Sequence, residues 1–155
     1  MRLEINIKKL SDKAVIPEYK SFGAAGFDFH AVVDQDNECF LGGKLVIPPK
    51  GQCLVKTDLA MSVPDGYELQ IRPRSGLSLK HSITVTNSPG TVDADWRGNI
   101  GIILYNLGED EFVIDTGDRI AQGVINKIEQ ANFNEVEGLD DTVRGDSGFG
   151  STGVK

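Results

Sequence analysis

The sequence has little cysteine, and no apolar run in it is long enough to cross a bilayer. Only Cys39 and Cys53 occur among 155 residues, and their spacing matches neither a metal site nor a redox motif. We therefore expect free thiols and an intracellular, cytoplasmic protein, because disulfides persist mainly in oxidising compartments. The first residues, Met1-Arg-Leu-Glu-Ile-Asn-Ile, do not have the pattern of a signal peptide. A membrane is not expected as a partner, since a span needs about 20 apolar residues.

Basic charge is also scarce, and its scarcity argues against one class of partner. The chain has 16 Lys and Arg against 23 Asp and Glu, which gives a formal charge of −7. Binding to a nucleic-acid backbone needs a basic footprint, so no nucleic acid is expected as a partner. An acidic protein can still bind a polyphosphate where a few arginines, backbone amides and Mg²⁺ converge.

No long segment repeats apolar residues with the 3.6 period of a helix, so helix is expected only over residues 75–81. Short stretches instead alternate apolar and polar residues between Gly- and Pro-rich turns. The expected strands cover 3–7, 27–32, 44–47, 52–63 (a strand pair or one bent strand), 67–72, 100–105, 111–115 and 124–128. This spacing predicts an all-β sandwich or barrel rather than βαβ units.

The stretch from Asn87 to Gly98 carries the most chemistry. Its Pro89-Gly90 pair marks a turn, and an apolar run follows Gly98, which predicts a long loop or hairpin leading into a buried strand. The stretch contains an amide, two carboxylates, an aromatic ring and a guanidinium: Asn87, Asp93, Asp95, Trp96 and Arg97. An amide can read a base edge, a ring can pack against a sugar or base, and a carboxylate can activate water. The same composition also fits a solvated hairpin with its tryptophan folded back on the core.

Three other polar positions fit either a site or ordinary structure. Asp28 is a lone acid between two aromatic residues, and it could simply be the outward-facing residue of its strand. Arg74-Ser75-Gly76 supplies a forked cation, a hydroxyl and backbone amides that can form an anion nest or begin a short helix. Gln122 could be a partly buried polar residue satisfied by the backbone.

The composition changes at Gly138 to a polar, Gly-rich segment. We expect residues 1–137 to form the folded domain and residues 138–155 a flexible C-terminal arm. Residues 148–153 spell G-x-G-x-x-G, but no strand precedes them and no helix can follow, which excludes a dinucleotide-binding fold. The segment can be a disordered tail. It can equally be a phosphate- and base-binding arm that uses Arg144, Ser151, Thr152 and Phe149.

Taken together, five stretches resemble the homotrimeric dUTPase family (dUTP diphosphatases), in the family's order and spacing. They cover residues 25–29, 73–77, 87–98, 117–122 and 144–153. The resemblance implies a jelly-roll-like β barrel and a homotrimer with active sites shared between subunits. It also implies Mg²⁺-dependent hydrolysis of dUTP to dUMP and diphosphate, which limits uracil in DNA and supplies dUMP for dTMP synthesis.

The resemblance implies a role for each polar group. Asp93 would activate the water that attacks the α-phosphorus. Asp28 would hold the water shell of a magnesium ion that is bound mainly by the triphosphate. The residues that would lie on phosphate oxygens in the barrel are Arg74, Ser75, Gly76 and Gln122.

The same resemblance assigns the groups that recognise the nucleoside and close the site. Trp96 would pack on the deoxyribose. Uracil would be read by the side chain of Asn87 and by the backbone around Thr91, Val92 and Gly101. In the arm, Phe149 would stack on uracil. The γ-phosphate would be bound by Arg144, Gly150, Ser151 and Thr152.

One departure and two alternatives limit this interpretation. The family usually has Tyr at position 96, so Trp96 puts the rejection of ribose in question. The related dCTP deaminases share the fold, but their catalytic Glu would fall at Ile103, which leaves deamination without a proton shuttle. A nucleotide-responsive binding or regulatory module, with an arm that orders on binding, is the other alternative. Asp93 argues against pure binding, because a carboxylate near phosphates repels them unless it serves the reaction. Protein partners are unknown.

Overall fold

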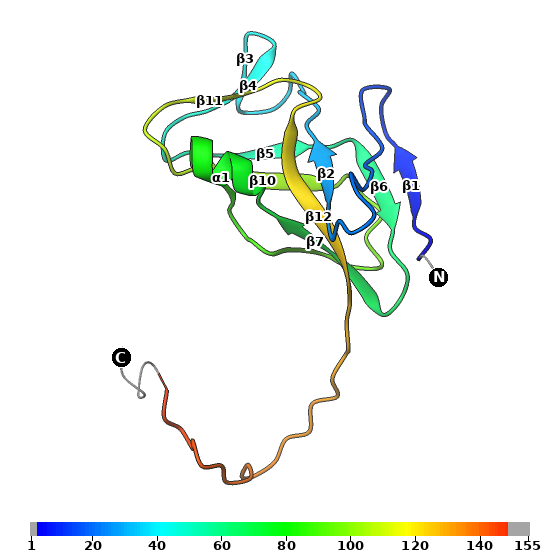
Figure 1. Ribbon diagram of the computed structural model, residues 1–155, viewed down its shortest axis with the longest axis vertical. Coiled ribbons are helices and arrows are strands. Elements are labelled where there is room, and N and C mark those ends of the chain that lie inside the picture. Colours follow the sequence, from blue (N-terminus) through cyan, green and yellow to red (C-terminus); the bar gives the residue numbers. More distant parts are fainter. Residues whose placement is uncertain (1–2, 149–155) are drawn as a thin grey trace.

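Twelve strands and one short helix make up the regular structure of the described residues, 3–148, in the computed structural model (Figure 1). The strands are β1 (Asn6–Lys9), β2 (Phe27–His30), β3 (Phe40–Leu41), β4 (Lys44–Ile47), β5 (Gln52–Lys56), β6 (Leu59–Ser62), β7 (Tyr67–Arg72), β8 (Ile83–Val85), β9 (Gly90–Val92), β10 (Gly101–Asn106), β11 (Phe112–Ile114) and β12 (Arg119–Lys127). The helix is α1 (Ser75–His81). The all-β prediction and the predicted position of the helix are confirmed.

The strands form four small antiparallel sheets, and most neighbours within a sheet are distant in sequence. The largest sheet has the order β2-β12-β7-β9, and the others are β5-β10-β8, β11-β4-β3 and β1-β6. In the largest sheet the last strand, β12, lies between β2 and β7. This sheet therefore brings three separate parts of the sequence side by side.

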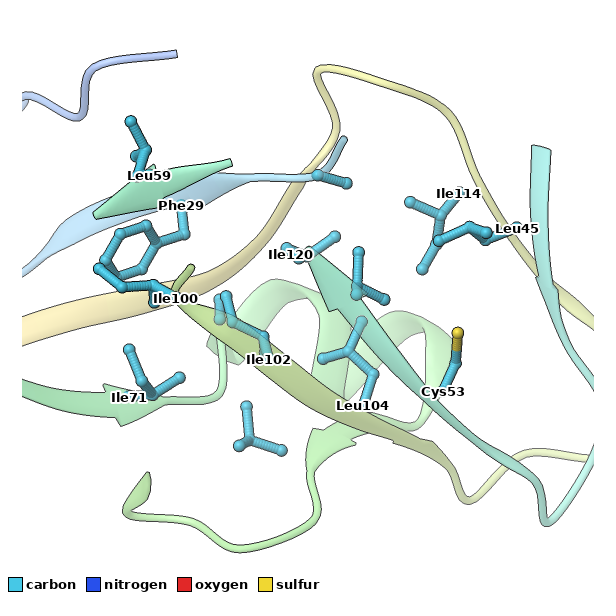
Figure 2. Close-up of a cluster of buried hydrophobic side chains, with 14 of the residues drawn as sticks. Phe29, Leu45, Cys53, Leu59, Ile71, Ile100, Ile102, Leu104, Ile114 and Ile120 are labelled. Atoms are coloured by element: carbon cyan, nitrogen blue, oxygen red, sulfur yellow. The ribbon is translucent and has the colours of Figure 1, made fainter. Parts of the chain in front are cut away.

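A single core fills the space between the sheets. Figure 2 shows Ile102 and Leu104 of β10 between Phe29 on one side and Leu45 and Ile114 on the other, and all five side chains are at most 1% exposed. A fully buried aliphatic or phenyl side chain contributes roughly 1.5–3 kcal/mol. The core fixes which face of each strand remains available for polar groups. On β7, for example, Leu69 is buried while Gln70 is only half-buried.

Several strand boundaries differ from the sequence-based expectation, and β3 and β8 were not expected as strands; three of the differences have an identifiable physical setting. β1 begins at Asn6, where pairing with the four-residue strand β6 begins. Residues 90–92 form β9 inside the expected loop, because Gly90 lets the chain approach Ile71 closely: a Cβ on Gly90 would lie 3.3 Å from the Ile71 Cβ. β12 begins at Arg119 rather than at residue 124. Its buried positions include the small residues Ala121 and Gly123, which do not produce a recognisable apolar–polar alternation in the sequence.

After β12 the chain leaves the body of the protein and extends away from it (Figure 1). The amide of Ile128 donates to the carbonyl of Gly66 (2.9 Å), and among the described residues the later hydrogen bonds of this segment are local. Phe133 and Leu139 are 94% and 88% exposed. The segment from 128 to 148 thus carries apolar side chains that nothing in the described chain covers. The boundary between domain and arm at residue 137 stays a prediction. Within residues 3–148, no helix has the length and apolar character needed to cross a membrane.

Candidate functional site

The end of the largest sheet at Asp28 gathers three of the sequence motifs. Asp28 lies on β2 opposite Gln122 of β12, and Gln122 lies opposite Arg72 of β7. Asp28 Oδ1 accepts a hydrogen bond from Arg74 Nε at 2.9 Å, and Asp28 Oδ2 accepts one from Arg119 Nη1 at 3.1 Å. We call Asp28, Arg74 and Arg119 the cationic cluster, because two guanidinium groups outweigh one carboxylate.

Backbone contacts hold the cationic cluster in place. Arg74 Nη1 donates to the carbonyl oxygen of Arg119 at 3.0 Å. Beside it, Gln122 Nε2 donates to the carbonyl oxygen of Pro73 at 2.8 Å. Gly26 makes room for this glutamine, since a Cβ there would lie 2.9 Å from Gln122 Oε1. The side chain of Gln122 is therefore partly buried and backbone-bonded, as one sequence interpretation expected, and it also lies beside the predicted phosphate ligands.

Partial burial strengthens the ion pairs of the cluster. The side chains of Asp28 and Arg74 are 18% and 23% exposed, whereas that of Arg119 is 47% exposed. Charges that are partly shielded from water attract each other more strongly than charges on an open surface. Ser75 and Gly76 follow Arg74 as the first residues of α1, and both are exposed. No side chain caps this helix end, which leaves its first amides beside the cluster.

His30 lies two residues after Asp28 on the same strand, opposite Arg119. Its Nδ1 is buried and has no hydrogen-bond partner among the described residues. Burial lowers the pKa of His30; Asp28 opposes this effect, and Arg119 adds to it. Burial and Arg119 thus favour the neutral form of the imidazole beside the cluster.

The stretch from Asn87 to Gly98 begins in the turn that precedes β9, continues through β9 and ends in an exposed loop. β9 pairs with β7 through Gly90–Ile71 and Val92–Leu69. The Trp96 amide donates to the Asp93 carbonyl at 3.2 Å, which closes a turn. Arg97 Nη1 donates to the carbonyls of Ala94 and Trp96 at 2.6 and 2.9 Å, so this guanidinium stabilises the loop itself.

Trp96 is not folded back on the core. Its side chain lies over Gly98, where a Cβ would come within 2.3 Å of the indole Cζ2, and Trp96 remains 51% exposed. A glycine at position 98 is therefore required for the ring to take this place. The exposed ring surface is available to a ligand.

Asp93 lies in a hollow of about 680 Å³ that we call the acidic hollow. Its lining includes four other carboxylates: Asp65, Glu68, Asp95 and Glu129. The lining has no lysine or arginine, and among the described residues no side chain donates a hydrogen bond to the exposed Asp93 carboxylate. Within a single chain, the acidic residues around Asp93 thus repel phosphate, and the carboxylate oxygens of Asp93 remain free to bind water.

The cationic cluster and the acidic hollow lie at opposite ends of β7. Asp93 follows Val92 toward the Glu68 end, whereas Asp28 is in the row of Arg72. Three strand spacings and four residues along the strand separate them, which corresponds to roughly 20 Å. The structure brings Asp28, Arg74 and Gln122 together, and it does not bring Asp93 to them within one chain.

The remaining predicted residues fall into three groups. Asn87 is exposed and packs over Gly90, with its Nδ2 3.3 Å from the position of a Cβ there. Thr91 is exposed on β9, and Gly101 begins β10 beside Leu54. Arg144 is exposed, and its Nε donates to the Ser147 carbonyl at 2.8 Å. The four other predicted arm residues lie outside the described residues: Phe149, Gly150, Ser151 and Thr152.

Arg119 is the group that sequence reasoning missed as a site residue. It was part of a recognised motif, but alternation counted back from Gln122 would place it on the core face. A register shift between Arg119 and Ala121 reverses that orientation. The only signal in the sequence is Ile120. Strict alternation would place this position on the outer face, where a polar residue is expected, yet the residue is apolar.

The predicted role of Asp28, to hold the water shell of a magnesium ion bound mainly by the triphosphate, stays a prediction. Among the described residues no group of three or more His, Cys, Asp or Glu side chains could hold a metal. Each Asp28 oxygen accepts one hydrogen bond from an arginine, and an ionised carboxylate oxygen can accept a second. Asp28 therefore keeps capacity for water, which is the role predicted for it.

Comparison with known proteins agrees with the predicted family. The dUTPase family model matches residues 12–153. A deoxyuridine 5'-triphosphate nucleotidohydrolase of Wolinella succinogenes is 55% identical over 152 residues, which cover 98% of this chain and 95% of that protein. One from Caulobacter vibrioides is 52% identical over 139 residues, 90% of this chain and 86% of that protein.

Solved structures agree as well. A mutant dUTPase of Staphylococcus bacteriophage 80alpha with dUpNHpp has a TM-score of 0.84 and 28% identity, covering 97% of this chain and 99% of that one. A mutant dUTPase of phage phi11, described with a structural Mg(II) ion, has a TM-score of 0.76 and 25% identity, covering 90% of this chain and 100% of that one.

The fold and these matches define the class as nucleotide hydrolases with an all-β, jelly-roll architecture. More narrowly, the chain belongs to the dUTPase family.

Proposed function

We propose that this chain hydrolyses dUTP to dUMP and diphosphate, with Asp93 as the base that activates the attacking water. The observation that carries the proposal is the convergence of Asp28, Arg74 and Arg119 into a half-buried cluster with one net positive charge. Such a cluster suits a polyphosphate, and the relatives at 55% and 52% identity bear the name of this activity. The alternative as a dCTP deaminase lacks its carboxylate, since position 103 is Ile.

The cluster binds the triphosphate. Arg74, Ser75 and Gly76 bind phosphate oxygens, and Gln122 lies beside them. Phosphoryl transfer depends mainly on positioning and on neutralising charge, and arginine suits both tasks because its donors are fixed in a fork. When bound mainly by the triphosphate, Mg²⁺ would supply further charge neutralisation, and Asp28 would hold its water shell.

The stretch around β9 recognises the nucleoside. The amide of Asn87 reads a base edge, with backbone groups of Thr91, Val92 and Gly101 reading the rest of uracil. Trp96 packs on the deoxyribose through its exposed ring. Asp93, at the end of β9, activates the water that attacks the α-phosphorus.

The site is shared between copies in a homotrimer. A general base must lie within about 3 Å of the water it activates, yet Asp93 and the cluster of one chain are roughly 20 Å apart. A second copy supplies the base by placing the loop after its own β9 against the cluster of the first copy. The Asp93 of the first copy then serves another site. Threefold closed symmetry satisfies every copy in this way.

The C-terminal arm closes over a site of another copy. Its proximal part exposes Phe133 and Leu139 and makes no described hydrogen bond to its own barrel beyond Ile128, which supports a place against a neighbour. Phe149 stacks on uracil. The γ-phosphate is bound by Arg144, Gly150, Ser151 and Thr152. Closure excludes water from the reaction.

In the cell, this reaction limits the incorporation of uracil into DNA and supplies dUMP for dTMP synthesis. Both roles follow from the chemistry of the substrate and product, and they suit a cytoplasmic protein. Neither requires a nucleic acid or a membrane as a partner.

Diphosphate release from dUTP, dCTP and UTP tests the activity directly. We expect rapid release from dUTP and little from the other two nucleotides. Ammonia release from dCTP would instead indicate a deaminase. Binding of dUTP without turnover would contradict the proposal and favour a regulatory module.

Complementation between inactive variants tests the shared site. Full-length Asp93→Asn is co-expressed with a wild-type chain truncated before Arg144. In a mixed closed trimer one site of three joins an intact Asp93 to an intact arm, so random 1:1 assembly makes about a quarter of all sites active. No rescue at any ratio would mean that one chain supplies both groups, or that the protein is a monomer.

A further inference from the structure

The strongest unassigned feature of the molecule is the bulge in β12 that precedes Gln122. Counted back from the Gln122–Asp28 pair, a regular ladder would place Ile120 on the outer face and Arg119 on the core face. The register instead pairs Arg119 with His30 and Ala121 with Phe29, so Ile120 is an extra residue. Ile120 is consequently 2% exposed in the core. A bulge re-aims side chains in this way and occurs frequently next to active sites.

The re-aimed Arg119 reaches the one carboxylate that faces the predicted phosphate ligand. Its Nη1 donates to Asp28 Oδ2 at 3.1 Å, while Asp28 Oδ1 is bound to Arg74 Nε at 2.9 Å. Its carbonyl oxygen accepts from Arg74 Nη1 at 3.0 Å. Arg119 therefore contacts both members of the Asp28–Arg74 pair, one through its side chain and one through its backbone.

The charge balance assigns a purpose to the side-chain contact. Asp28 and Arg74 alone form a neutral pair, in which the carboxylate competes with phosphate for the guanidinium. Arg119 compensates the carboxylate and leaves the cluster with one net positive charge. Two of the five N–H donors of Arg74 are occupied, which leaves three for a ligand.

We propose that Arg119 is a positioning residue for dUTP hydrolysis: by neutralising Asp28 it keeps Arg74 available to the phosphates of the substrate. The proposal rests on the proposed function. It places the effect of Arg119 in affinity for the triphosphate, and it predicts that the effect depends on Asp28. Asp93 and the chemical step are not affected.

Binding and kinetics of full-length Arg119→Gln separate this role from a structural one. We expect the Kd for dUpNHpp to rise about tenfold or more, the loss typical of a hydrogen bond to a charged group. The Kd for deoxyuridine should stay unchanged, and the rise in KM for dUTP should exceed the fall in kcat. Arg119→Lys keeps the charge and should recover most of the affinity. Equal losses for deoxyuridine and dUpNHpp would overturn the proposal.

A double variant tests the dependence on Asp28. Asp28→Asn combined with Arg119→Gln restores one net positive charge on Arg74. In magnesium-free buffer, where metal-bound water plays no part, the double variant should bind dUpNHpp close to the wild-type Kd. If it binds as weakly as Arg119→Gln, then Arg119 contacts the phosphates itself and the positioning role is wrong.

Two controls keep the outcomes distinct. Lys44→Gln removes a cation of similar exposure that is paired with Asp115 (2.8 Å) and takes no part in the described hydrogen bonds of the cluster. It should leave dUpNHpp binding unchanged. Thermal melting and oligomer size show whether each variant folds. If Arg119→Gln does not fold, Arg119→Met, which also removes the charge, gives the same comparison with and without Asp28→Asn. A wild type that binds dUpNHpp but does not hydrolyse dUTP refutes the proposed function. If the wild type hydrolyses dUTP and Arg119→Gln binds dUpNHpp with an unchanged Kd, only the role of Arg119 is refuted.

Discussion

The cationic cluster and the acidic hollow occupy the same sheet but are built in opposite ways. In the cluster, four described hydrogen bonds fix Asp28, Arg74 and Gln122 before any ligand is present. In the hollow, Asp93 is exposed and accepts no hydrogen bond from a described side chain. The comparison indicates a division of labour: groups that bind charge are preorganised, whereas a group that must bind and deprotonate water is left free.

The largest expected effect comes from removing the free carboxylate. Asp93→Asn should keep the fold and nucleotide binding but lose about 3–5 kcal/mol of transition-state stabilisation, the usual range for a general base. Single-turnover kinetics with dUTP measure this loss in the chemical step. Turnover within a factor of ten of wild type would show that the acidic hollow does not supply the base. The proposed division of labour between the hollow and the cationic cluster would then be wrong.

A large effect is also expected from removing the arm, which belongs to neither region. Truncation before Arg144 should leave the oligomer intact and reduce turnover on the order of 100-fold, because water exclusion and γ-phosphate contacts are lost. Light scattering and steady-state kinetics measure the two outcomes. Dissociation of the oligomer would mean that the arm is mainly structural, and normal turnover would mean that it is only a tail.

A smaller effect should follow from removing the ring of Trp96, which follows Asp95 in the same loop. Trp96→Ala is expected to lower the ratio of kcat/KM for dUTP to that for UTP by roughly tenfold, the scale on which one apolar contact discriminates substrates. A substitution in the cationic cluster should leave the dUTP/UTP ratio of kcat/KM unchanged, because the two nucleotides carry the same phosphates. If Trp96→Ala leaves it unchanged too, ribose is rejected elsewhere, for instance by close backbone approach.

The smallest effect concerns pH. Burial lowers the pKa of His30 below its usual value near 6.5, so the unfolded chain takes up this proton more readily than the folded one. Stability is therefore complete above the unfolded pKa and falls as the pH drops from there toward the folded pKa. Thermal melts of wild type and His30→Asn should diverge in this window, with wild type losing more. Parallel curves would contradict the assignment.

Alternation in the sequence predicted most of the fold because each strand has one face in a shared core. The same rule failed where the backbone departs from a regular ladder. Gly90 admits β9 into an expected loop, and the extra residue Ile120 turns Arg119 outward. The candidate site was predicted as a list of residues, but not as two separate halves, because the order of strands β2-β12-β7-β9 cannot be read from local periodicity.

The bulge at Ile120 also has a consequence for insertions and deletions. Removing this one residue would restore a regular ladder between β12 and β2, in which Arg119 keeps its place opposite His30 on the outer face. The buried place of Ile120, which is 2% exposed, would however be left without a side chain. The number of residues in β12 is therefore as constrained as their identity. Length variation in this chain should be tolerated in the segment after Lys127 and rejected between Gly117 and Gln122.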